Sequence, residues 1–255
     1  MAETTESELD IENLVATALD KSASSDERID AIDEMCEASP VPDRVHETLV
    51  ALLRDSDDKV RGEAITALRD APSPRAIDAL IGEIEREKSS NPRWIYGVTI
   101  SNLCQALGAC GEGDPRAIDA LIGQLRVEQS MYAARGAYAA LIDMGPRAAR
   151  ARDALEVIVR DGRPWEQAHA HLALWAQDDE VDRHVRALVP LLAETKEGGG
   201  SAAAAAKIAL ERIGERAIAI LEQPDLAKGR FAKHARSMIE NIRARSAKRA
   251  GQTTS

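Results

Sequence analysis

Histidines are the side chains of this 255-residue chain that are best suited to bind a metal ion or to transfer a proton, and there are five of them. His169 and His171 are two residues apart in a stretch that we expect to be helical, so their side chains point to different faces. Zinc-binding pairs on one helix are four residues apart. For His184 and His234 we expect no acidic or histidine partner at ligand spacing. We therefore predict no metal site and no cofactor, and structural or surface roles for the histidines.

The three cysteines are the strongest candidate nucleophiles, and their placement argues against catalysis. Cys36, Cys104 and Cys110 are odd in number and contain no CxxC spacing, which disfavours both a disulfide framework and a zinc site. Cys104 and Cys110 lie on one apolar stretch without a neighbouring histidine, so we expect buried, unreactive thiols. The sequence has no nucleophile elbow, phosphate-binding loop or dinucleotide motif. We predict no catalytic residues and favour a protein that is not an enzyme.

Aromatic residues are scarce, yet four of the seven fall near the start of three successive stretches that we expect to be helical. Arginines lie close to them in the sequence. Aromatic rings and arginines dominate the energetics of protein interfaces, so an exposed strip of this kind predicts a partner-binding surface. The alternative is that the rings pack into seams between helices. The predicted strip consists of Trp94, Tyr96, Tyr132, Trp165, Arg61, Arg93, Arg135 and Arg163.

Charge is distributed unevenly along a chain whose net charge is −10. Residues 1–38 hold twelve acidic and two basic residues, whereas residues 228–255 hold eight basic residues and one acidic residue. The basic end is either a solvated terminal helix or a surface for an anionic partner. We expect nucleic acid to bind nowhere else, and we allow weak head-to-tail association between the oppositely charged ends. The candidate basic surface contains Lys228, Arg230, Lys233, Arg236, Arg243 and Arg245.

An internal repeat indicates the elements that position these residues. The sequence PRAIDALIG occurs at 74–82 and again at 115–123, 41 residues later. Periods of this length are typical of solenoids built from helical pairs. Each copy begins with proline, which suits the first position of a helix, and continues with apolar residues at helical spacing. Weaker copies start at 42, 146 and 180. We expect a second helix after each of the five copies, at about 57–70, 92–109, 130–144, 164–177 and 200–214, and further second helices at 25–38 and 228–246.

Composition agrees with an all-α solenoid, or superhelix, of about seven antiparallel helical pairs. Apolar residues make up 44% of the chain but aromatic residues only 3%, which suits closely stacked helices rich in alanine and leucine. We expect a disordered acidic segment at 1–9, a single solenoid at 10–246 and a disordered tail at 247–255. The N-terminus has no apolar stretch typical of a secretion signal, and no apolar run is long enough to span a membrane. We therefore expect a cytoplasmic protein.

The segment DKVRGEAITAL at 58–68 resembles the second helix of a HEAT-like repeat of the kind found in phycobilin-lyase-type HEAT proteins, and LVPLLAE at 188–194 resembles the first helix. The resemblance implies that second helices line a concave face. The chain departs from the family pattern in its later repeats, where the position that is arginine in the family is occupied by other residues: Ile100, Ala134, Gln167 and Ala203. We predict a scaffold or adaptor that binds a partner protein on this face. The alternatives are a lyase-type or DNA-repair-type enzyme, or an anionic partner at the basic end.

Overall fold

The computed structural model describes residues 6–90, 97–125, 131–194 and 202–252, and within these ranges every regular element is a helix. The predicted fold class is confirmed: the chain is an all-α solenoid of antiparallel helical pairs. It divides into two compact units, Met1–Met144 and Gly145–Ser255. None of the described helices is both long enough and apolar enough to cross a membrane.

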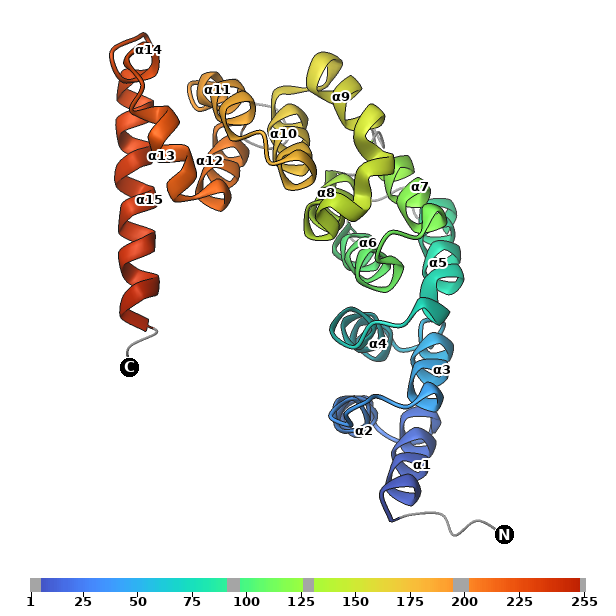
Figure 1. Ribbon diagram of the computed structural model, residues 1–255. Coiled ribbons are helices and arrows are strands. Elements are labelled where there is room, and N and C mark those ends of the chain that lie inside the picture. The colour runs from blue at the N-terminus through green and yellow to red at the C-terminus, as the bar shows by residue number, and fades with distance from the viewer. Residues whose placement is uncertain (1–5, 91–96, 126–130, 195–201, 253–255) are drawn as a thin grey trace. The chain divides into compact units, whose positions relative to one another are not determined.

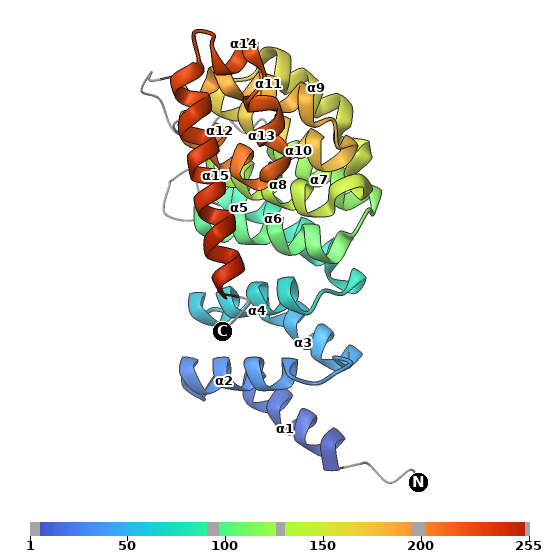
Figure 2. The same cartoon turned by 60° about the vertical axis from the view of Figure 1, so that its left-hand side comes forward.

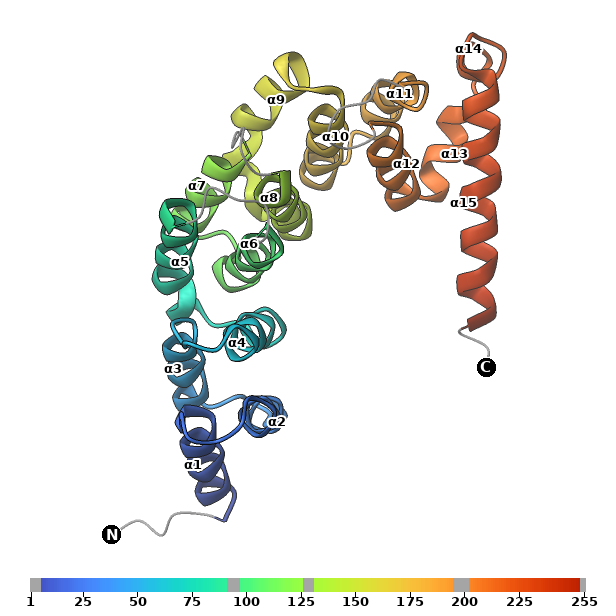
Figure 3. The same cartoon turned by 180° about the vertical axis from the view of Figure 1, so that it is seen from behind.

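The first unit consists of four helical pairs, whose members form two rows (Figures 1 and 3). The second helix of each pair packs on the second helix of the next. We call these the second-helix row: α2 (Ser25–Cys36), α4 (Asp58–Asp70), α6 (Gly97–Gly111) and α8 (Met131–Met144). The other row contains α1 (Glu6–Leu19), α3 (Asp43–Leu52), the 3₁₀ turn η1 (Pro74–Ala76) with α5 (Ile77–Ser90), and α7 (Pro115–Gln124).

The second unit contains three further pairs. The first joins η3 (Gly145–Ala151) and α9 (Arg152–Asp161) to α10 (Pro164–Asp178), and the second joins α11 (Val181–Leu191) to α12 (Ala202–Ile213). In the last pair, α13 (Glu215–Leu221) and α14 (Pro224–Ala227) pack on α15 (Ala232–Gln252). α13 and α14 were not predicted from the sequence, because helices this short contain too few turns for their apolar residues to show a helical spacing.

The helices extend beyond the predicted bounds of the solenoid. Residues 6–9 belong to α1 and residues 247–252 belong to α15, although both stretches were expected to be disordered. The last buried residue of α15 is Ile242, and the C-terminal part of the helix extends past α12 and α13 (Figures 1 and 3). Alanine, arginine and lysine are strong helix formers and favour the helical conformation in this last stretch.

Helix starts follow the sequence signals closely. The predicted capping box is confirmed: the Ser24 hydroxyl accepts from the Glu27 N–H at 3.2 Å, and the Glu27 carboxylate accepts from the Ser24 N–H at 2.9 Å. The two copies of PRAIDALIG both place proline at the first helical position. Each proline is preceded by a capping side chain, Ser73 in one copy and Asp114 in the other.

A buried ion pair joins the first two helical pairs. The Arg28 guanidinium meets the Asp55 carboxylate at 3.1 and 2.5 Å, and both side chains are about 95% inaccessible, at 5% and 4% exposed. Arg28 Nε also donates to the Ala18 carbonyl at 2.9 Å. Arg61, at the family's arginine position, donates to the Asp55 carbonyl at 2.6 Å. Charged groups buried in this way hold a fixed geometry because an unpaired partner would be strongly destabilising.

Two glycines lie where α6 and α8 pack closely against each other. A methyl group built on Gly136 would lie 2.6 Å from the Cα and the carbonyl oxygen of Ser101. One built on Gly108 would lie 2.6 Å from the Ala140 Cβ. Glycine at these two positions therefore allows the two second helices to pack almost backbone to backbone.

We expect Gly136→Ala to lower the free energy of unfolding by about 1–3 kcal/mol, because the Ser101 backbone must move to accommodate the methyl group. Gly62→Ala is the matched control, since Gly62 is also inside a second helix but nothing lies within 4 Å of its added methyl group. The control should be neutral or stabilising by up to about 1 kcal/mol through helix propensity. Urea unfolding followed by circular dichroism measures both, and equal effects of the two substitutions would contradict the close approach.

Candidate functional site

A groove opens on the second-helix row between α2 and α4, which lie side by side (Figures 1 and 2). It is a cavity of about 210 Å³. Both helices contribute acidic side chains to it, together with one half-buried thiol and small residues at its floor. We call this the acidic groove; it is lined by Asp33, Cys36, Glu37, Glu63, Thr66, Ala67, Asp70 and Ala71.

The acidic groove carries negative charge that the described residues do not balance. Asp70 pairs with Arg69 at 2.9 Å, and the same guanidinium attracts the Glu63 carboxylate, whereas Asp33 and Glu37 form no ion pair with any described residue. Burial, and then the neighbouring charge and hydrogen bond of Asp33, raise the pKa of Glu63. Carboxylates crowded in this way favour a cation, which would relieve their mutual repulsion.

The cysteine thiols do not behave as nucleophiles. Burial, followed by nearby carboxylates, raises the pKa of Cys36 to about 11. Burial also raises the pKa of Cys104 to about 12 and raises that of Cys110. All three thiols are therefore protonated at neutral pH, and the thiolate is the reactive form.

The predicted aromatic and arginine strip is only partly available for binding. Arg93, Trp94 and Tyr96 lie outside the described residues. On α8, Arg135 is exposed and Tyr132 is half-buried.

Arg61, on α4, contacts the start of its own helix: it donates to the Asp55 carbonyl in the preceding loop and pairs with Asp58 in the first turn. These contacts within the chain do not support the predicted role of Arg61 in partner binding.

Trp165 requires a correction, because its ring is 4% exposed rather than forming part of an open surface. It packs edge-on against the His169 ring, with 5.7 Å between the ring centroids, and Arg163 stacks on it at 5.3 Å. The Arg163 guanidinium also pairs with Glu166 at 2.6 Å. The ring is buried, which agrees with the alternative interpretation that the aromatic residues are packed rather than exposed.

The basic end forms an exposed surface on and before α15. Arg243 pairs with Glu222 at 2.8 Å, and Arg245 pairs with Glu211 at 2.9 Å. The remaining predicted basic residues are exposed: Lys228, Arg230, Lys233 and Arg236. The terminal helix therefore presents a cationic surface that its own unit neutralises only in part.

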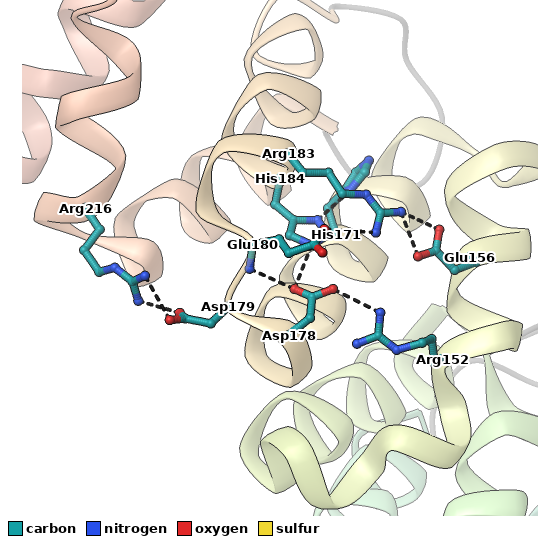
Figure 4. A network of polar contacts seen from close by, with 9 residues as sticks. All are labelled: Arg152, Glu156, His171, Asp178, Asp179, Glu180, Arg183, His184 and Arg216. Carbon is teal, nitrogen blue, oxygen red and sulfur yellow. Dashed lines mark hydrogen bonds and ion pairs between the residues drawn. The ribbon is translucent and has the colours of Figure 1, made fainter.

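A polar network in the second unit was not predicted from the sequence (Figure 4). It is centred on the turn between α10 and α11, where Asp179 adopts a left-handed conformation with φ of 61°. The Nδ1 atoms of His171 and His184 lie 3.0 Å apart, and His184 Nε2 lies 3.2 Å from Asp178 Oδ1. Arg152 holds the other Asp178 oxygen at 3.1 Å.

Further ion pairs surround this network. Arg183, on α11, contacts both oxygens of Glu156 on α9, at 2.6 and 2.7 Å. Arg216, on α13, pairs with Asp179. The network therefore links four helices of the second unit through charges that converge on one turn (Figure 4).

Burial governs the protonation of the two histidines. Burial and then the proximity of His184 lower the pKa of His171 to about 4. Burial also lowers the pKa of His184, although Asp178 opposes the shift. Both rings are therefore neutral at pH 7. In the simplest arrangement, His171 donates to His184, which in turn donates to Asp178.

The spacing of these residues along the chain gave little indication that they form a network. His171 and His184 are 13 residues apart and lie on different helices, so only the packing of α10 on α11 brings them together. One signal was present: Glu180 precedes His184 by four residues, which is a ligand spacing on a helix.

Comparison with known proteins supports the architecture. Residues 11–94 match the family model of HEAT repeats. Among solved structures, the complex of CpcE and CpcF of phycocyanin lyase from Nostoc sp. PCC7120 matches with a TM-score of 0.53 and 16% sequence identity, covering 95% of this chain and 96% of that chain. No curated protein matches the sequence. The chain is thus a HEAT-like α-solenoid, and its predicted resemblance to HEAT proteins of the phycobilin-lyase type is confirmed for the fold.

The histidine pair should make stability depend on pH. The folded-state pKa of His171, about 4, lies below its ordinary value of 6.5, so its contribution is present above pH 6.5 and is lost as the pH falls toward 4. We expect the free energy of unfolding to fall by about 2 kcal/mol between pH 7 and pH 5 from this group. His171→Asn should remove most of that slope. Urea unfolding in the presence of a chelator tests this, and an unchanged slope in the variant would show that other groups titrate.

Proposed function

We propose that the chain is a non-catalytic scaffold or adaptor that holds a segment of a partner protein on its second-helix row. The acidic groove between α2 and α4 carries this proposal. Its cavity of about 210 Å³ lies on the row that HEAT-like proteins use for binding, and its four carboxylates outnumber Arg69, the cation that pairs with Asp70 and attracts Glu63. A lysine or arginine of a partner segment would form charge-assisted hydrogen bonds there.

Other features of the first unit support a protein ligand. Arg135 and Tyr132 on α8 are residue types that interfaces favour. The protonated thiols offer no nucleophile. The matching phycocyanin lyase structure is itself a complex of two proteins, which agrees with a protein partner for this chain.

The proposal predicts that neutralising the groove removes the partner. The full chain would be immobilised and exposed to native lysate, and captured proteins would be identified by mass spectrometry and their affinities then measured. Asp33→Asn/Glu63→Gln should weaken binding of the captured partner at least about tenfold, because buried charge pairs contribute strongly to interfaces. Circular dichroism and thermal unfolding would establish that the variant is folded.

Asp30→Asn/Glu34→Gln is the matched control. These two residues are exposed on the same helix α2 and do not line the groove, and the double substitution removes the same charge. It should leave binding within about twofold, since peripheral exposed charges contribute little. Equal loss in both variants would indicate general electrostatic attraction and would contradict a groove-specific scaffold.

A second candidate function is binding of an anionic partner by the basic end, favoured by the exposed cations on α15. Lys233→Glu/Lys248→Glu would then abolish capture, while the groove variant would retain it. Binding would also weaken steeply between 50 and 200 mM salt if the anion were nucleic acid.

The enzymatic alternatives predict different ligands and different binding surfaces. A lyase-type role, suggested by the fold shared with the phycocyanin lyase complex, predicts saturable binding of an open-chain tetrapyrrole, visible as a change in its absorbance spectrum. A DNA-repair-type role requires a basic binding face, whereas the first unit's row carries the acidic groove. Saturable pigment binding that depends on a second subunit would replace the scaffold proposal with the lyase.

A further inference from the structure

The turn between α10 and α11 carries a side-chain cluster that partner binding on the first unit does not use. We propose that Asp178, Glu180 and His184 form a binding site for one divalent first-row metal ion, of the class that includes Zn²⁺ and Co²⁺. One ligand atom from each residue lies within 4.8 Å of the other two (Figure 4). The proposal revises the sequence-based expectation that the chain has no metal site.

Two of the three ligand atoms are already at the separation that a shared metal requires. Metal–ligand bonds of about 2.0–2.2 Å place adjacent ligand atoms roughly 3.0–3.5 Å apart. His184 Nε2 and Asp178 Oδ1 are 3.2 Å apart. Glu180 is exposed, so rotation about its side-chain bonds brings its carboxylate the remaining distance without a change in the backbone.

His171 orients the proposed ligand His184. Metal-binding histidines donate their other ring N–H to a fixed acceptor, which sets the tautomer. With a metal on Nε2, the His184 Nδ1–H would donate to His171 Nδ1, 3.0 Å away. The metal would take the Nε2 position that otherwise donates to Asp178, and both neutral rings would change tautomer, so that His184 carries its proton on Nδ1 and His171 carries its proton on Nε2.

The surroundings hold Asp178 in place and leave room for positive charge. Its Oδ1 accepts from the Glu180 N–H at 3.0 Å, and its Oδ2 accepts from Arg152 at 3.1 Å. The network contains four carboxylates and three guanidinium groups around two histidines. Arg183 pairs with Glu156 at 2.6 Å and with Glu180 Oε2 at 3.6 Å, and the metal would replace the longer of these two contacts when Glu180 turns toward it.

The donor set determines the class of metal. One imidazole and two carboxylates suit Zn²⁺, Co²⁺, Fe²⁺ or Mn²⁺, whereas Ca²⁺ and Mg²⁺ prefer oxygen donors alone and Cu⁺ prefers sulfur. Three protein ligands leave at least one position open to water. The fully buried His184 lies at the inner end of the site, and the exposed Glu180 lies at its entrance.

The test uses the full chain without an affinity tag, stripped with a chelator and titrated with Zn²⁺ in a calorimeter and with Co²⁺ in a spectrophotometer. We expect one equivalent of each metal to bind, with visible Co²⁺ absorption. Glu180→Gln should weaken Zn²⁺ at least about tenfold, because it removes a ligand. This variant changes an exposed side chain and should remain folded.

Two further variants make the result specific. His184→Gln should abolish binding, with circular dichroism to confirm the fold. His169→Gln removes a histidine that is more accessible than His184 and lies on α10, the helix that carries Asp178. This variant should bind the metal normally. Absence of binding to the wild-type chain at 1 mM metal, or equal affinity in the wild-type, Glu180→Gln and His184→Gln proteins, would overturn the proposal.

Discussion

The close stacking of neighbouring second helices is the constraint on which the first unit depends. No helical pair buries its apolar face alone, so each relies on the next pair to complete its core. Gly108 and Gly136 allow α6 and α8 to approach closely, and α8 buries Ala133, Ala134, Ala137 and Ala140. The scarcity of aromatic residues follows from this geometry, since large rings would hold such helices apart.

Polar groups enter the solenoid in two different ways. Arg28 and Asp55 are buried and satisfy each other, so they fix the geometry between two pairs and leave nothing to bind a ligand. The acidic groove has the opposite character, because the half-buried Glu63 has the negatively charged Asp33 beside it and the groove holds more carboxylates than cations. Stability is best served by the first arrangement and binding by the second. This difference is why the groove, rather than the buried pair, carries the proposed function.

The sequence predicted the architecture because the signals for a helical solenoid are local. The repeated PRAIDALIG and the capping box at Ser24 each specify a helix start within a few residues, and the structure confirms both. The sites depend on contacts between helices, which no local pattern encodes. The groove requires α2 beside α4, and the histidine pair requires α10 beside α11. The burial of Trp165 was not predicted either, because the local sequence around the ring does not show how much of it is covered in the fold.

Hydrogen–deuterium exchange of the chain with and without its captured partner would test the central claim most directly. If the second-helix row holds the partner, amide protection should increase in peptides from α2 and α4, which flank the acidic groove, while α1 and α3 remain unchanged. Side-chain docking on one row reduces local opening only where contacts form. Protection confined to α1 and α3, or to α15 alone, would contradict the account and would move the binding surface to another part of the solenoid.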